Sequence, residues 1–259
     1  MEEAGNISLS GQISHAGSSR SSNLSFITPT RGLTSPDLTG LLDHLAAQAG
    51  EWGTFHLLAE VDEHALSFDV LRTAGFSVYA WQRVWRYQTD SANMPLTPEG
   101  ITWESVNDRD QIPVKSLCQS LVPAFVQPIE SVFDKRLEGL ICREDCGVMG
   151  YADLIFGREG TWVQPYIHPE AKFVPAVLAE LLRQVEQRGS HSIYICVRSY
   201  QAWIESALEE LPVLASPRQA LLVRHLAVMQ KALNPIRVAA MENSRRGATM
   251  ARADTSKRI

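Results

Sequence analysis

Two carboxylates stand at the end of an apolar stretch and could act as a base. Residues 55–61 read Phe-His-Leu-Leu-Ala-Glu-Val, which predicts a largely buried strand that carries Glu60 near its end and Asp62 just beyond it. A carboxylate held beside a reacting group can accept a proton from it. Carboxylates at strand ends are also often simply solvated, so both interpretations of Glu60 and Asp62 stay open.

The cysteines and histidines do not form a pattern typical of a metal site. Cys142 and Cys146 are separated by three residues on a predicted hairpin, but no second Cys/His pair follows at ligand spacing. Packing as small apolar side chains is the interpretation we favour for them. The chain also lacks a Gly-x-Ser-x-Gly elbow and a P-loop. We therefore predict no metal, and neither a serine hydrolase nor a P-loop NTPase.

Apolar spacing predicts alternating strands and helices, so the fold class is α/β. Residues 37–48 show apolar positions at helical spacing, and Gly50 is expected to end that helix. Pro165 is expected to stop the strand predicted at residues 161–164. The predicted strands cover residues 24–27, 55–61, 76–87, 101–106, 137–143, 147–156, 161–164, 193–197 and 219–228. The predicted helices cover residues 37–48, 65–73, 111–125, 174–187 and 201–211.

Two blocks of the chain agree in spacing. The interval from Pro29 to Gly53 equals the interval from Pro165 to Gly189, and each block then continues with a strand, a short helix and a strand. Such self-similarity predicts a repeated structural unit. The first block lacks the opening strand, first helix and hairpin of the second, so we read it as the C-terminal half of a domain.

This element order resembles the GNAT superfamily of N-acetyltransferases. Residues 27–32, Ile-Thr-Pro-Thr-Arg-Gly, are similar to the family's fourth strand and the start of its pyrophosphate loop. Residues 71–76, Leu-Arg-Thr-Ala-Gly-Phe, are similar to its late-helix segment. The resemblance covers residues 25–87 as a half domain and 101–228 as a full one. It implies a mixed, mostly antiparallel sheet flanked by helices, present in tandem as a half domain and a full domain.

The resemblance also implies a cofactor loop, from which both copies depart. A pyrophosphate needs backbone N–H donors at a helix N-terminus, and glycines let the backbone approach it closely. The family pattern is R/Q-x-x-G-x-G/A. The first copy keeps Arg31 and Gly32 but adds Pro36 and the anionic Asp37. The second copy, residues 166–172, has no glycine and places Glu170 where phosphate would lie.

Family membership implies an acyl-CoA-dependent N-acyltransferase that acetylates an amine of a small molecule or peptide. Acetyl-CoA would be the co-substrate, with Glu60 and Asp62 as candidate bases. Leu71 stands where the family places a catalytic tyrosine. The alternative is a noncatalytic pseudo-acetyltransferase that acts as a binding or interaction module. The residues implied to hold the co-substrate are Thr28, Thr30, Arg31, Gly32 and Thr34.

Composition argues against several other classes of protein, namely nucleic-acid-binding, membrane-spanning, secreted and disulfide-rich ones. The formal charge of −5 argues against nonspecific nucleic-acid binding by the whole chain. No apolar run reaches the ~18–20 residues of a membrane span, and the acidic N-terminus does not resemble a signal peptide. Four cysteines are too few for a disulfide framework, so we expect a cytoplasmic protein.

The expected domain organisation follows from these patterns. Residues 1–23 are a flexible leader or truncated strands, 24–88 the half domain, and 89–99 a polar linker with two prolines. Residues 100–229 are the second GNAT-like domain. Residues 230–259 are a basic tail that we predict to be disordered, because seven Lys/Arg face only two acidic residues there.

Overall fold

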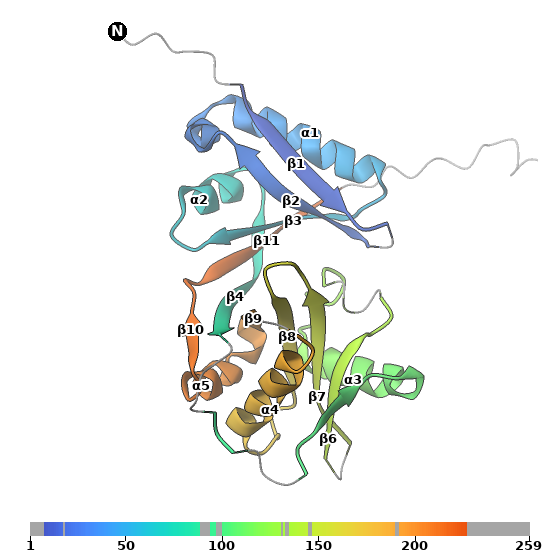
Figure 1. Cartoon of the computed structure of the whole chain (residues 1–259). Coiled ribbons are helices and arrows are strands. Elements are labelled where there is room, and N and C mark those ends of the chain that lie inside the picture. Colours follow the sequence, from blue (N-terminus) through green and yellow to red (C-terminus); the bar gives the residue numbers. More distant parts are fainter. Residues whose placement is uncertain are drawn as a thin grey trace, which may run out of the picture. The chain divides into compact units, whose positions relative to one another are not determined.

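The computed structural model describes residues 8–17, 19–88, 94–96, 100–130, 132, 135–144, 147–189 and 192–226. Within them one mixed sheet runs in the order β1-β2-β3-β11-β4-β9-β8-β7-β6-β5, and β10 pairs with β4 beside this path (Figure 1). Most neighbours in the sheet are antiparallel; β2 with β3 and β8 with β9 are parallel. The fold class is therefore a mixed, mostly antiparallel sheet flanked by helices, as predicted. No helix in the described ranges is long and apolar enough to cross a membrane.

We call residues 10–88 the first segment, and its helices cover one face of its strands. α1 and α2 bury Leu38, Leu42 and Leu71 against Leu57 and Ala59 of β3. This apolar face follows the helical spacing of the sequence. The elements of the first segment are β1 (Ser10–His15), β2 (Ser21–Thr28), the 3-10 helix η1 (Thr30–Thr34), α1 (Asp37–Glu51), β3 (His56–Asp62), α2 (Leu66–Thr73) and β4 (Ser77–Gln88).

The second segment, residues 103–225, has helices on both faces of its strands. Ile141 and Tyr151 pack with α3, whereas their strand neighbours Leu140 and Ala152 pack with α4 and α5. Successive strand residues point to opposite faces, so α3 and α4 lie on opposite sides of the sheet. The elements of the second segment are β5 (Trp103–Ser105), η2 (Asp108–Asp110), α3 (Gln111–Leu121), β6 (Gly139–Glu144), β7 (Gly147–Phe156), β8 (Thr161–Ile167), α4 (Val174–Glu186), β9 (Ser192–Arg198), η4 (Ser199–Gln201), α5 (Trp203–Glu209), β10 (Val213–Ala215) and β11 (Gln219–His225).

The two segments repeat the same element order at a constant offset. β3 starts at residue 56 and β9 at 192, and β4 starts at 77 and β10 at 213, so the offset is identical for both pairs. The helices α1 and α4 are each followed by a glycine in the left-handed region, Gly53 at φ 82° and Gly189 at φ 90°. Only glycine adopts this conformation without strain, which explains the matched spacing in the sequence.

The segments exchange strands. β11, from the second segment, lies between β3 and β4 and pairs antiparallel with both. In return, the C-terminal half of the long β4 lies between β9 and β10 of the second segment. The change of partner occurs at Gln82, which is opposite Gln219 of β11 and also opposite Arg198 of β9. Each segment therefore completes its sheet with a strand that belongs to the other.

Several sequence expectations differ from the structure. Residues 10–15, within the segment expected to be a leader, form the regular strand β1. Helix α1 passes Gly50 and ends at Glu51, because Gly53 supplies the left-handed turn. Strand β11 ends at His225 instead of residue 228. The predicted linker, except residues 94–96, and the predicted basic tail lie outside the described residues.

The expectation that Pro165 stops its strand is wrong. Strand β8 continues to Ile167, with Pro165 opposite Ala152 of β7. The Pro165 carbonyl accepts a hydrogen bond from Gln201 Nε2 at 3.0 Å, so that side of Pro165 faces away from β7. In a strand, the N–H and the carbonyl of one residue point to the same side. The N–H that Pro165 lacks would therefore also face away from β7, and no hydrogen bond between β7 and β8 is lost.

Candidate functional site

The parallel strands β2 and β3 separate after three residue pairs and leave an opening. They pair only from Ser21 opposite His56 to Asn23 opposite Leu58. Beyond this point β2 continues to Thr28 paired with β1, and β3 continues to Asp62 paired with β11. Among the described residues, no hydrogen bond bridges the two facing strand edges. Unpaired backbone groups of this kind are available to a ligand.

The paired end of this opening contains a histidine cluster. Ser21 Oγ lies 3.3 Å from Nδ1 of His56, and the rings of His56 and His225 meet edge to face at 5.2 Å between centroids. Burial, His225 and Arg20 lower the pKa of His56 below its ordinary value. The folded protein therefore favours the neutral form of His56 more than the unfolded chain does.

The lowered pKa of His56 predicts a loss of stability in acid. The unfolded chain takes up this proton below about pH 6.5, whereas the folded protein does so only at lower pH. The free energy of unfolding should stay level above about pH 7.5 and fall as the pH drops through 6.5, by at most about 1.4 kcal/mol per pH unit. Urea unfolding at pH 7.5 and 5.5 measures this, with the exposed His44→Gln as the control. His56→Gln should reduce the slope between these pH values, and an unchanged slope would contradict the assignment to His56.

The residues implied to hold the co-substrate lie at the far end of the opening. Thr28 ends β2, and Thr30, Arg31, Gly32 and Thr34 lie on η1, so one short segment brings all five together. Arg31 is exposed, and in the described part of the chain its guanidinium makes no ion pair or hydrogen bond, although its backbone carbonyl accepts one from Thr34 Oγ1 at 3.4 Å. It is the one cation of this set and remains available to an anion.

The backbone of this loop is largely satisfied within the protein. The N–H of Gly32 donates to Pro29 at 2.9 Å, and the N–H of Ser35 donates to Gly32 at 3.0 Å. Ser35 in turn accepts from the first amides of α1, those of Asp37 and Leu38. Since α1 also begins with the Asp37 carboxylate, this helix N-terminus offers few free donors and an unfavourable charge to phosphate.

A hollow lies between this loop and α2. Its volume is about 250 Å³. Of the five predicted residues only Thr34 lines it. Its lining residues from η1 and the start of α1 are Leu33, Thr34, Ser35, Leu38 and Thr39, and those from α2 and the turn after it are Asp69, Val70, Thr73 and Ala74. Sequence reasoning missed the α2 side, because its residues are ordinary helical ones with no motif.

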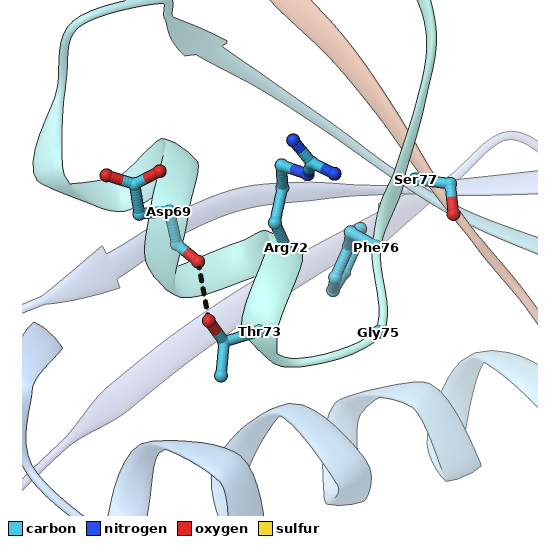
Figure 2. A pocket seen from close by; sticks show the side chains of 6 residues that line it. All are labelled: Asp69, Arg72, Thr73, Gly75, Phe76 and Ser77. Carbon is cyan, nitrogen blue, oxygen red and sulfur yellow. Dashed lines mark hydrogen bonds between the residues drawn. The ribbon is translucent and has the colours of Figure 1, made fainter.

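Figure 2 shows a second hollow, of about 460 Å³, at the C-terminal end of α2. Thr73 donates from Oγ1 to the carbonyl of Asp69 at 2.9 Å, while the Arg72 side chain extends away from that bond. Gly75, at φ 88°, turns the chain here, and Phe76 donates from its N–H to the carbonyl of Leu71 at 3.1 Å. This helix stop explains the Gly-Phe pair of the sequence. Leu71 is buried in the core, so no side chain reaches the opening from that position.

The two candidate bases lie where β3 has left β2. Glu60 and Asp62 are both exposed, and their positions alternate with the buried Ala59, so they lie on the face opposite α1 and α2. Glu60 Oε2 accepts a hydrogen bond from Gln82 at 3.2 Å, and Asp62 Oδ1 accepts one from Gln219 at 3.2 Å. The structure therefore places both carboxylates on one face, beside two glutamines that the sequence did not indicate.

The corresponding opening in the second segment is closed by a side chain. β8 and β9 pair only from Thr161 opposite Ile193 to Val163 opposite Ile195, and then separate. Gln201, which is 1 % exposed, fills the gap. Its Oε1 accepts from the N–H of Ile167 at 3.1 Å, and its Nε2 donates to the carbonyl of Pro165 at 3.0 Å. The backbone that a ligand would use is therefore occupied.

Replacing Gln201, the side chain that fills this gap, should lower the stability of the protein. In a Gln201→Leu variant the buried N–H of Ile167 and carbonyl of Pro165 lose their partner, and each such group costs about 1–3 kcal/mol. Urea unfolding should show a lower midpoint with an unchanged slope. The same substitution at the more exposed Gln184 on α4 should change the midpoint little. Equal effects at the two positions would show that Gln201 does not satisfy buried backbone groups.

In the described residues, no group of three or more His, Cys, Asp or Glu side chains is placed to hold a metal ion. Cys142 packs in the core as predicted, and Cys146 lies outside the described residues. Burial raises the pKa of Cys196 to about 11, which disfavours its thiolate.

Comparison with known proteins identifies the fold. A crystal structure of a GCN5-related N-acetyltransferase from Sphaerobacter thermophilus matches with a TM-score of 0.55 at 13 % identity, over 84 % of this chain and 76 % of that one. A tandem GNAT protein from the clavulanic acid biosynthesis pathway matches with a TM-score of 0.51 at 13 % identity, over 88 % and 82 %. A conserved protein of unknown function from Staphylococcus epidermidis ATCC 12228 reaches 0.57 at 9 % identity, over 80 % and 85 %.

No protein-family model matches the chain, and no curated protein does either. The fold is that of the GCN5-related N-acetyltransferases, as predicted from the element order.

Proposed function

We propose that the chain is an acyl-CoA-dependent N-acyltransferase with one working site, in the first segment. The observation that carries this proposal is the contrast between the two openings. The β2–β3 opening is unbridged, whereas the equivalent β8–β9 opening is filled by Gln201. The chain would then be a half domain and a full domain in tandem, in which only the half domain binds substrate and the full domain has a structural role.

The first opening suits an acyl-CoA as substrate in two respects. The unpaired edge of β2 offers N–H and carbonyl groups to the amides of the pantetheine arm. Arg31 offers a charged donor to the phosphates, and charge-assisted hydrogen bonds of this kind are the stronger ones. The amides of Gly32 and Ser35 already donate hydrogen bonds within the protein. Arg31 would therefore contribute more to phosphate binding than the corresponding residue does where a glycine-rich loop offers free amides.

The reaction would be acyl transfer from sulfur to nitrogen. Glu60 takes the proton from an ammonium group of the acceptor, and the freed amine forms a bond to the thioester carbon. The nitrogen then loses its second proton to solvent and the carbon–sulfur bond breaks. The departing thiolate takes a proton from solvent, because the position of a tyrosine acid is filled by the buried Leu71. Glu60 is preferred over Asp62 because it lies nearer to the point where β3 leaves β2. The acceptor class is an amine of a small molecule or peptide.

Binding and turnover test this proposal separately. Titration calorimetry with acetyl-CoA should give one site per chain. Arg31→Ala should weaken the binding by about tenfold to a hundredfold, since a charged hydrogen bond contributes about 1.5–3 kcal/mol. Arg109→Ala, an exposed arginine of the second segment, is the matched control. Thiol release from acetyl-CoA with a panel of amines should fall at least about a hundredfold in Glu60→Gln. Absence of heat at millimolar acetyl-CoA would contradict the proposal.

The second candidate is a noncatalytic module that keeps the fold. It is favoured by the occupied amides of the loop and by Leu71, which removes the family's tyrosine. This candidate predicts that Arg31→Ala changes nothing except stability. Absence of thiol release from any amine, together with equal calorimetric traces for the parent and Arg31→Ala, would support it over the enzyme.

A further inference from the structure

Gln82 lies at the single point where β4 passes from one segment to the other. Its backbone is opposite Gln219 of β11 and Arg198 of β9 at the same time. Its side chain is 2 % exposed, on the face that also carries Glu60. A buried amide at such a junction must find all of its partners inside the protein.

The Gln82 amide uses its full hydrogen-bonding capacity. Nε2 donates to Glu60 Oε2 at 3.2 Å and to Gln219 Oε1 at 2.9 Å. Oε1 accepts from the Arg198 guanidinium and from Cys196 Sγ, the latter at 3.2 Å. Two N–H groups and two lone pairs are all that an amide has.

The direction of this amide is fixed by Arg198. A guanidinium has only donors, so the atom of Gln82 that faces it must be the carbonyl oxygen. The NH₂ group is then forced toward Glu60. Arg198 is itself held by Glu130, with 3.4 Å between Nε and Oε1, and both side chains are 9 % exposed. Although burial opposes the charge, Glu130 keeps the pKa of Arg198 above its ordinary value.

We propose that Gln82 is a positioning residue that holds the Glu60 carboxylate in one orientation, with its own direction set by Arg198 of the second segment. Gln82 occupies only Oε2, and in the described residues no other hydrogen bond to the Glu60 carboxylate occurs, so Oε1 stays open to take a proton. An exposed glutamate without such a bond samples several rotamers. The second segment thereby orients the base of the first. This inference rests on the proposed acyl transfer by Glu60.

A double-mutant cycle in the full chain tests this inference. Gln82→Met keeps the length of the side chain and removes the donor. It should lower kcat for thiol release by about tenfold to a hundredfold while KM for acetyl-CoA stays within about twofold. The Glu60→Gln/Gln82→Met double variant should be no slower than Glu60→Gln alone, because Gln82 acts through Glu60. An unchanged kcat in Gln82→Met, or independent losses that multiply in the double variant, would overturn the proposal.

Cys196→Ala is the matched control, since it removes another buried partner of Gln82 without touching Glu60. It should lower stability and leave kcat near that of the parent. If Gln82→Met does not fold, Gln82→Asn keeps the amide but shortens its reach by one methylene, and it should show the same loss of kcat.

Crystal structures separate this inference from the proposed function. If neither the parent nor Glu60→Gln releases thiol above background, acyl transfer is wrong, but the positioning role can still be judged. Structures of the parent and Gln82→Met should then show the Glu60 carboxylate ordered in the first and displaced in the second. An identical Glu60 conformation in both would overturn the positioning role.

Discussion

Replacing Leu222 of β11 by alanine should destabilise the whole chain by about 2–5 kcal/mol. Leu222 is fully buried and packs in the core of the first segment, with Leu57 and Leu71, although it belongs to the second. A Leu→Ala change in a packed core loses burial and leaves a cavity, which accounts for this magnitude. Because β11 joins β3 to β4, the two segments should lose structure in a single cooperative transition. Urea unfolding followed by circular dichroism measures both quantities.

Leu214→Ala is the control for this prediction. Leu214 lies on β10, the short strand that precedes β11, and is 72 % exposed. Its replacement should change the free energy of unfolding by no more than about 0.5 kcal/mol. Similar losses at the two leucines, or two separate transitions in Leu222→Ala, would contradict the strand exchange.

Removing Arg198 should cost about 3–5 kcal/mol. Arg198→Met leaves the buried carboxylate of Glu130 without its counter-charge, and breaking a buried pair at one side has a penalty of this size. The Gln82 oxygen loses a donor at the same time. The double variant Arg198→Met/Glu130→Leu should recover most of the stability, because it removes both charges. Thermal and urea unfolding of the two single variants and the double variant measure the coupling.

The exposed ion pair between Arg136 and Asp108 is the control for the buried pair of Arg198 and Glu130. Its side chains are 67 % and 83 % exposed, so Arg136→Met should change stability by less than about 1 kcal/mol. If the double variant at the buried pair were less stable than Arg198→Met alone, the loss would come from packing and not from an unpaired charge.

Local features of the fold could be predicted from the sequence. The helical spacing of Leu38, Leu42 and Leu45 gave α1, since one face of a helix that packs on a sheet must be apolar. Gly189 marked the end of α4 correctly, whereas the end of α1 was placed too early at Gly50, because Gly53 is the glycine that adopts positive φ there. Element order and resemblance also led to the choice of Thr28, Thr30, Arg31, Gly32 and Thr34 and of the carboxylates Glu60 and Asp62, whose roles stay predictions.

The exchange of β4 and β11 could not be predicted, because periodicity shows which face of a strand is buried but not which strand lies beside it. Gln82 and Gln201 were missed for a related reason. A glutamine in the sequence gives no sign of burial, and its role here comes from partners far along the chain, such as Pro165 for Gln201 and Arg198 for Gln82. Pro165 was misread because its effect depends on which side of β8 carries the ladder.

A crystal structure of the chain grown with acetyl-CoA tests the central claim, a single thioester site in the first segment. The expected result is one acetyl-CoA with its pantetheine arm along β2 between Leu24 and Thr28, its phosphates at Arg31, and Gln201 still bonded to Pro165 and Ile167. Acetyl-CoA between β8 and β9, with Gln201 displaced, would contradict the account.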